Sequence, residues 1–325
     1  MVITFWTCVV GLLAVLSLVI FILNLVIAVI ILMTKKLRRS RFNFLSVILA
    51  FTDMIAITLT YGPQRLPMYF YPTVANTTFG PVSAYFCNSG FAAIKWLQNF
   101  ITFLICYYAY KAVLHPTKFT NAWKTIEVYL CGGFGFSIFA LFAFAIGPLL
   151  EGTPSVYHFY NESDSESPPT ACMTMENGQP TRFWKTQIVF SSIVTVLTGV
   201  LSAFLNLRMQ YEQYTRKKRM AGSVGRSRRF VNVRMVIKAV TQLTFLVSNG
   251  IIAFLYLFGL KWEGFEYAGY VIADTSCAIA PVFILICNKE VRKRIFFCKR
   301  PSLLCCKKPS TYTSRVYSIP RAGNL

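Results

Sequence analysis

The chain has 325 residues, of which 55% are hydrophobic and only 14% are charged, and its mean hydropathy is +0.52. Because soluble globular domains carry about 25% charged residues, this composition excludes an ordinary soluble protein and indicates a membrane protein. The formal net charge of +21 does not indicate nucleic-acid binding, because the basic residues lie in the gaps between apolar runs.

Seven apolar runs are long enough, or nearly so, to cross a bilayer as helices, which takes about 20 residues. We expect the spans at residues 3–33, 43–62, 86–112, 126–149, 186–207, 237–259 and 266–287. The first run lacks the basic n-region of a signal peptide, so we interpret it as a retained span. The predicted fold is an all-α membrane protein, a bundle of seven transmembrane helices.

Lysine and arginine are distributed unequally between the gaps. Twenty-eight of them lie in the gaps after the first, third and fifth runs and in the tail, whereas four lie in the remaining gaps. The positive-inside rule therefore predicts that the N-terminus lies outside and the tail lies in the cytoplasm. We divide the chain into a transmembrane domain at 1–287, an amphipathic, Cys-rich segment at 288–308 and a disordered cytoplasmic tail at 309–325.

Several features fall on the side that is predicted to be outside. Asn76 and Asn161 begin glycosylation sequons in these gaps. Of the ten cysteines, only Cys87 and Cys172 lie at or beyond the outer boundary, in an oxidising compartment. We expect these two to form a disulfide, and the alternative is two free thiols.

Two polar residues are expected at matched depth near the middle of the bilayer, Asn24 in the first run and Asp53 in the second. A buried carboxylate is costly there, which indicates a polar cluster or a bound cation. A lone Asn in the first helix and the LAFTD segment in the second resemble signatures of rhodopsin-like (class A) G-protein-coupled receptors. The resemblance implies that Asp53 binds Na⁺ and that Asn24, Asp53 and Pro281 belong to an activation network. The alternative is a neutral Asp53 hydrogen-bonded to Asn24 and nearby hydroxyls.

The third run contains a lysine, Lys95, far inside it, and Asp274 lies at a matching depth in the last run. The resemblance implies that these helices face each other across a ligand pocket, so that Lys95 and Asp274 can meet. One interpretation is a structural ion pair. The other is a ligand site, in which Lys95 binds an anionic ligand or Asp274 a cationic one, with Trp96 and Asn99 nearby.

The inner end of the third run departs from the family pattern. The Asp-Arg-Tyr motif is replaced by Tyr108, Ala109 and Tyr110, and no arginine occurs between Arg65 and Arg182. This erosion is similar to that of fast-diverging chemoreceptor groups such as the nematode serpentine receptors. The resemblance therefore implies a receptor whose coupling is atypical.

The segment after the last run, NKEVRKRIFFCKR, resembles the short amphipathic eighth helix that lies along the inner membrane surface. Three cysteines within or just after it are candidates for palmitoylation, namely Cys298, Cys305 and Cys306. Membrane lipids are thus expected partners of this part of the chain.

The resemblance implies a multi-pass receptor of the plasma membrane that binds an extracellular ligand and signals to a heterotrimeric G protein or arrestin. One alternative is a receptor-like protein that is constitutively active or acts as the partner of another receptor. A transporter or channel is disfavoured because the sequence shows no internal repeat. We expect no enzyme, because His115 and His158 are the only histidines and lie on opposite faces of the membrane. No cofactor beyond Na⁺ is expected.

Overall fold

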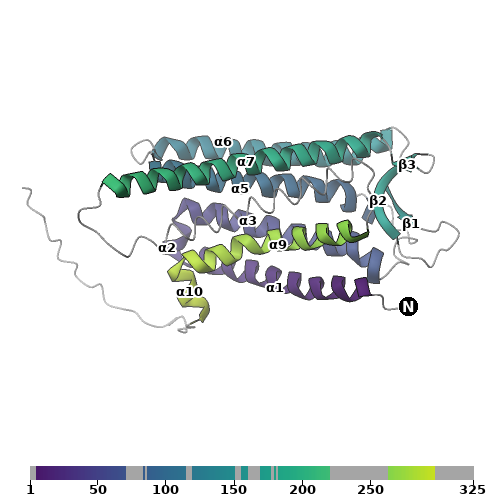
Figure 1. Ribbon diagram of the computed structural model, residues 1–325, viewed down its shortest axis with the longest axis horizontal. Coiled ribbons are helices and arrows are strands. Elements are labelled where there is room, and N and C mark those ends of the chain that lie inside the picture. The colour runs from purple at the N-terminus through teal and green to yellow at the C-terminus, as the bar shows by residue number, and fades with distance from the viewer. Residues whose placement is uncertain are drawn as a thin grey trace, which may run out of the picture.

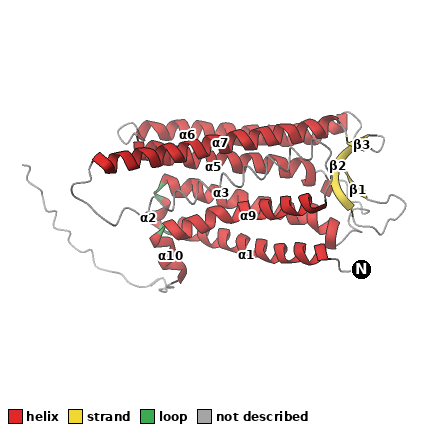
Figure 2. Ribbon diagram, in the orientation of Figure 1, coloured by secondary structure: helices red, strands yellow, loops and turns green. Residues whose placement is uncertain are grey.

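The computed structural model describes residues 5–70, 83–84, 86–114, 119–150, 155–159, 169–176, 179–180, 182–219 and 263–296. Long helices run side by side in this part of the chain, and a small sheet lies at one end of them (Figures 1 and 2). The long helices are α1 (Phe5–Met33), α3 (Arg41–Leu59), α5 (Phe91–Leu114), α6 (Phe119–Leu150), α7 (Arg182–Arg219) and α9 (Glu263–Cys287). Shorter helical elements are α2 (Lys35–Arg38), α10 (Lys289–Phe296) and two π-helical segments, η1 (Thr60–Phe70) and η3 (Phe86–Gly90).

Four helices of the described part are long and apolar enough to cross a membrane. These stretches are Cys8–Met33, Arg41–Arg65, Lys124–Ala143 and Lys185–Glu212. A fifth candidate is α9 together with α10, which are bent by 94° relative to each other. The third predicted span corresponds to η3 and α5, and the predicted span at 237–259 lies outside the described residues. The count of seven spans and the side of the N-terminus stay predictions.

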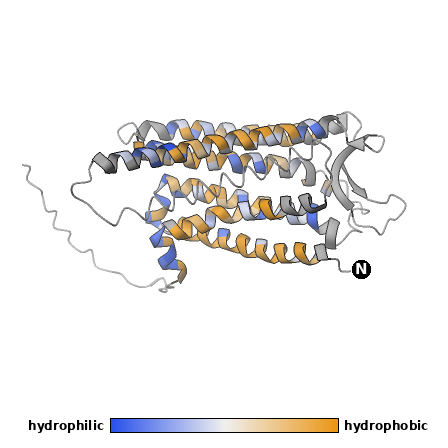
Figure 3. Cartoon of the chain, in the orientation of Figure 1, coloured by the Kyte–Doolittle hydropathy of each residue, from blue (hydrophilic) through white to orange (hydrophobic). Residues whose placement is uncertain are grey.

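The apolar side chains divide between the interior of the bundle and its outer surface. α5 packs against α3, α6 and α7, while α3 also packs against α1 and α9. One buried apolar cluster joins α1, α3, α5, α6 and α9 and includes Ile20, Leu45 and Ile101. Large apolar side chains of α1, α6 and α7 are exposed at the surface of the bundle. Hydrophobic residues recur along these three helices (Figure 3). Such exposed apolar side chains are stable next to lipid chains, which supports a membrane-embedded bundle.

The end of α3 continues directly into η1, where the winding widens. Pro63 has no backbone N–H and cannot donate the α-helical bond to the carbonyl of Leu59. The chain adopts π-helical turns from Thr60 onwards instead of ending, so the helix extends beyond the predicted boundary at residue 62. This extension brings Arg65 into the interior of the bundle.

The gap between the expected spans 126–149 and 186–207 contains a three-stranded antiparallel sheet. Its strands are β1 (Ser155–Phe159), β2 (Pro169–Glu176) and β3 (Gln179–Pro180), in the order β1-β2-β3. Tyr157 pairs with Cys172, and a register shift follows His158. The SVYHF segment is rich in residues that favour strands, which explains why this stretch is not irregular. The predicted helical bundle is confirmed, and this small sheet is a feature that the sequence analysis did not predict.

Candidate functional site

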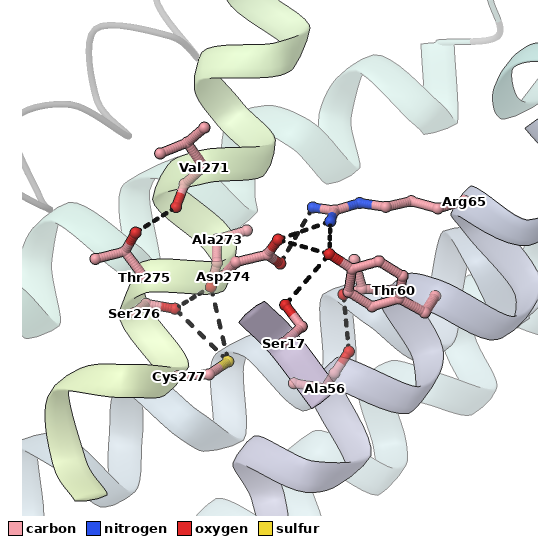
Figure 4. Close-up of polar contacts among 11 residues, drawn as sticks. Ser17, Ala56, Thr60, Arg65, Val271, Ala273, Asp274, Thr275, Ser276 and Cys277 are labelled. Atoms are coloured by element: carbon pink, nitrogen blue, oxygen red, sulfur yellow. Dashed lines mark hydrogen bonds and ion pairs between the residues drawn. The ribbon is translucent and has the colours of Figure 1, made fainter. Parts of the chain in front are cut away.

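A buried ion pair joins η1 to α9 near the sheet end of the bundle. The Nη1 atom of Arg65 lies 2.7 Å from Oδ2 of Asp274, and Nη2 lies 3.1 Å from Oδ1 (Figure 4). The Arg65 side chain is 0% exposed and the Asp274 side chain is 3% exposed. A guanidinium that donates to both carboxylate oxygens forms a strong and directional pair. The position of α9 against η1 is thus fixed by two charge-assisted hydrogen bonds.

The hydroxyl of Tyr61 extends this pair into a cluster that also reaches α1. It donates to Oδ2 of Asp274 at 2.8 Å, and it accepts hydrogen bonds from Arg65 and from Ser17 Oγ, the latter at 3.2 Å. The Arg65 guanidinium also lies 4.5 Å from the centre of the Tyr61 ring, a cation–π contact. We call Ser17, Tyr61, Arg65 and Asp274 the outer cluster. It connects three elements that are distant in the sequence.

The outer cluster corrects one expectation from the sequence. We expected Lys95 to meet Asp274; instead Arg65 holds both oxygens of that carboxylate, and Lys95 donates to Ser276 Oγ at 3.3 Å. Arg65 is one of the four basic residues that we expected in the outer gaps, and its side chain is instead buried in the bundle. A signal was present, since Tyr61 and Arg65 are four residues apart, a spacing that places both side chains on one face of a helix.

A second cluster lies deeper in the bundle and begins at the proline of α9. Pro281 has no N–H, so the carbonyl of Cys277, four residues earlier, lacks its normal helical donor. Asn24 of α1 donates its Nδ2 to this carbonyl at 3.4 Å. A polar side chain from a neighbouring helix thus satisfies a backbone group that the proline leaves without a donor, as membrane helices require.

Gln98 of α5 links this carbonyl site to Asp53. Its Nε2 donates to Oδ1 of Asp53 and to Sγ of Cys277, the latter at 3.4 Å. Asn24, Asp53 and Pro281 therefore do belong to one connected set, which we call the inner cluster together with Cys277 and Gln98. No hydrogen bond joins Asn24 to Asp53 in the described part of the chain. The alternative in which Asp53 is bonded to Asn24 is therefore wrong about the partner of Asp53, which is Gln98.

The arrangement around Asp53 does not fit a sodium ion well. The second carboxylate oxygen, Oδ2, is buried and has no hydrogen-bond partner among the described residues, so one oxygen is available as a ligand. The neighbouring groups are donors, however: Gln98 presents its NH₂, and the ammonium of Lys95 is close enough to act on the carboxylate electrostatically. Nor do the described residues contain a group of three or more His, Cys, Asp and Glu side chains suited to a metal.

Trp96 and Asn99 of α5 face a different helix from Lys95. Trp96 Nε1 donates to Ser191 Oγ of α7 at 3.0 Å, and Asn99 Nδ2 donates to Thr195 Oγ1 at 3.0 Å. The Trp96 ring also lies between the Phe136 ring of α6, at 5.7 Å, and the Phe190 ring of α7, at 5.2 Å between centroids. The four candidate ligand residues are thus divided between the α5–α9 side and the α5–α7 side.

The inner end of α5 shows what stands in place of the family's charged motif. The Tyr108 ring packs against Phe42 of α3, with centroids 6.5 Å apart. Lys111 lies above the Tyr107 ring at 5.5 Å, and Tyr107 stacks on Phe103. Aromatic packing and a cation–π contact therefore occupy the position where the family has Asp-Arg-Tyr.

Several predicted sites lie outside the described residues or have side chains outside them. They are Asn76, Asn161, Cys298, Cys305, Cys306 and the side chains of Cys87 and Cys172. The backbone of β2, which carries Cys172, lies against η3, which carries Cys87. The disulfide, glycosylation and palmitoylation sites stay predictions.

The chain was compared with protein families and with curated proteins. The family model described as "Srg family chemoreceptor" matches residues 11–295, which is nearly the whole chain. The search of curated proteins found no match. The family match confirms the predicted likeness to nematode serpentine receptors, and the apolar helices agree with a multi-pass membrane receptor. The chain belongs to the Srg family of chemoreceptors.

Proposed function

We propose that this protein is a cell-surface chemoreceptor that binds an extracellular ligand between α5 and α9 and signals through its cytoplasmic loops. Family membership supports the receptor class. The observation that carries the position of the site is the polar junction between the two helices. Long side chains of α5 form this junction, because Lys95 donates to Ser276 and Gln98 donates to Cys277.

A ligand is able to change such a junction because one hydrogen-bond acceptor replaces another in a bundle interior at small net cost in free energy. A typical intramolecular hydrogen bond contributes about 1 kcal/mol net, whereas leaving a buried donor unsatisfied costs more. A ligand acceptor that replaced Ser276 Oγ at the Lys95 ammonium would satisfy the lysine and release this part of α9. The ligand would then bind more tightly to the arrangement in which Ser276 is released than to the one in which Lys95 is bonded to Ser276. A difference in affinity of this kind is the requirement for shifting the populations of the two arrangements.

The outer and inner clusters define the part of α9 that is able to respond. Asp274 is held by Arg65 on one side of the junction, and the Cys277 carbonyl is held by Asn24 on the other. Ser276 lies between these two fixed points. We infer that ligand binding alters the segment between Asp274 and Pro281, where the proline already lowers the number of backbone bonds.

The clusters also narrow the class of ligand. Arg65 neutralises Asp274, so a cationic ligand would have to compete with a buried bidentate pair. Lys95 is half-buried and carries a cationic group at the junction, where Ser276 accepts one of its hydrogen bonds. We therefore favour a ligand with a carboxylate or another strong acceptor over a cationic ligand.

Coupling to the cytoplasmic partner is proposed to be atypical. A heterotrimeric G protein or arrestin is the partner expected of the receptor class. The arginine of the Asp-Arg-Tyr motif of rhodopsin-like receptors is absent here, and Ala109 occupies its position. In its place, the contact of Tyr108 with Phe42 links α5 to α3. We propose that this aromatic contact restrains the inner end of α5 in the unliganded state.

A second candidate function is a receptor-like protein that signals without ligand or only with a partner receptor, which the missing arginine favours. A screen of diverse small molecules on cells that express the chain, read by cyclic nucleotides and calcium, separates the two. The proposal expects a dose-dependent response to at least one acidic or acceptor-rich compound. High basal second messenger without any ligand response would favour the second candidate. Ligand-dependent ion flux in liposomes containing the protein alone would instead indicate a channel or transporter.

A further inference from the structure

The end of the bundle opposite the sheet carries two short basic helices, α2 and α10, at the same place in the fold (Figure 1). α2 follows α1 directly, and α10 follows α9 after a bend of 94°. If α9 crosses the membrane, a helix bent by this angle runs close to the membrane plane. This end is the one that the positive-inside rule places in the cytoplasm.

One apolar cluster holds both helices. Leu37 of α2 and Val291 of α10 are buried in it together with Ile27 and Ile31 of α1 and Val47 of α3. The two short helices are therefore attached to the same apolar centre, so their outward faces have a defined relation to each other.

Hydrogen bonds fix each helix further. Asn43 Nδ2 donates to the Leu37 carbonyl at 2.9 Å, which attaches α2 to α3. Asn288 Oδ1 accepts from the backbone N–H groups of Glu290 and Val291 and caps the start of α10. Arg292 donates to the carbonyls at the end of α9, at 3.0 Å for Leu285, so its guanidinium is occupied by the protein.

The remaining basic side chains of the two helices and of Arg39 point to solvent. All seven are exposed, and none has an ion-pair partner within the described part of the chain: Lys35, Lys36, Arg38, Arg39, Lys289, Lys293 and Arg294. Glu290 is the one acidic residue in these two segments. Like charges that are held close together without counter-charges repel each other, so an anionic ligand would stabilise this arrangement.

Apolar side chains border the basic surface. Phe296 at the end of α10 is 68% exposed, and Met33 at the end of α1 is also exposed. Basic residues combined with exposed apolar residues on a helix in the membrane plane are typical of binding to an anionic lipid surface. An acidic protein segment would match the charge but would leave Phe296 and Met33 in water.

We propose that α2 and α10 together form a binding surface for phospholipid headgroups that carry several phosphates, in the inner leaflet. The positive-inside rule explains why basic residues lie on this side, but it does not explain why they surround one apolar cluster without acidic partners. Two helices fixed on a common centre provide several positive charges for one headgroup. A multiply phosphorylated headgroup therefore binds better than a singly charged one.

The test uses the purified full-length chain in nanodiscs that contain either phosphatidylinositol 4,5-bisphosphate or phosphatidylserine at matched total charge. Native mass spectrometry measures the lipid that stays bound. The two variants are Lys35→Gln with Lys36→Gln in α2, and Lys293→Gln with Arg294→Gln in α10. The matched control is Lys124→Gln with Arg208→Gln, which removes two exposed charges from α6 and α7.

The wild type is expected to retain the bisphosphate lipid preferentially. Each basic residue near an anionic surface contributes about fivefold in affinity, so each double variant is expected to lose about 25-fold, and the control less than about twofold. When both pairs are replaced together, the loss is expected to be smaller than the product of the two, because one headgroup contacts both helices. Photocrosslinking of a lipid analogue is expected to label peptides from both α2 and α10, independently of any substitution.

Three results would overturn the proposal. One is equal retention of the two lipids at matched charge. Another is an equal loss in the control variant, which would show an effect of net charge alone. The third is crosslinking to an acidic protein partner, or elsewhere on the bundle, with neither α2 nor α10 labelled.

Discussion

Replacing Arg65 by methionine tests the outer cluster directly. The substitution keeps a long apolar side chain but leaves the Asp274 carboxylate, 3% exposed, with the Tyr61 hydroxyl as its remaining visible donor. Removing one partner of a buried ion pair costs about 3 to 5 kcal/mol, because the other charge stays buried and uncompensated. At about 2 to 4 °C per kcal/mol, we expect the melting temperature to fall by at least about 6 °C.

Thermal unfolding in detergent, followed by fluorescence-detected size exclusion, measures this change. The double variant Arg65→Met with Asp274→Leu removes both charges and is expected to recover most of the loss, because apolar residues replace a buried pair at little cost. Lys185→Met, at an exposed position of α7, is the control and is expected to shift the melting temperature by less than about 2 °C. An Arg65→Met protein that melts like the wild type would refute the ion pair.

Three further predictions concern packing and the remaining clusters. A Cβ at Gly133 would overlap the Phe100 ring, so Gly133→Ala is expected to destabilise by about 1 to 3 kcal/mol in the same melting assay. Gly132→Ala, with open space around it, is the control, and an equal effect of both substitutions would contradict this packing. Asn24→Ala is expected to lower the melting temperature of the wild type. It is expected to have less effect in a Pro281→Ala background, because residue 281 then supplies an N–H to the Cys277 carbonyl. Equal effects in both backgrounds would show that Asn24 does not stabilise the protein through this carbonyl. Cys87→Ser and Cys172→Ser are each expected to reduce surface expression, and non-reducing peptide mapping of the wild type is expected to find the two cysteines in one linked peptide; recovery of both as free thiols would refute the disulfide.

The positions of the helices followed from the sequence because bilayer thickness sets the length of an apolar run. The first expected span, 3–33, and the observed α1, Phe5–Met33, agree within two residues. The second differs because Pro63 changes the winding of the backbone without ending the helix. Hydropathy does not report such a change of winding. The winding depends on which residue lacks a backbone N–H, whereas hydropathy reports only how polar each side chain is.

The membership of the inner cluster was predicted in part. Asn24, Asp53 and Pro281 belong to recognisable motifs, but the residues that connect them, Gln98 and Cys277, carry no motif of their own. Their role depends on which helices are neighbours, and sequence spacing alone does not give this. The partner of Asp274 was missed for the same reason, because the burial of Arg65 depends on the π-helical extension beyond α3.

We propose that Lys95 contacts the ligand at the α5–α9 junction. The most direct measurement compares the response of Lys95→Met with that of the wild type, at surface levels matched by antibody labelling of an extracellular tag. Lys185→Met, which removes an exposed lysine from α7, is the control. We predict that Lys95→Met reaches the surface and loses the ligand response, while the control keeps both. A Lys95→Met receptor with an unchanged dose–response curve, or one that loses surface expression together with its response, would contradict the account.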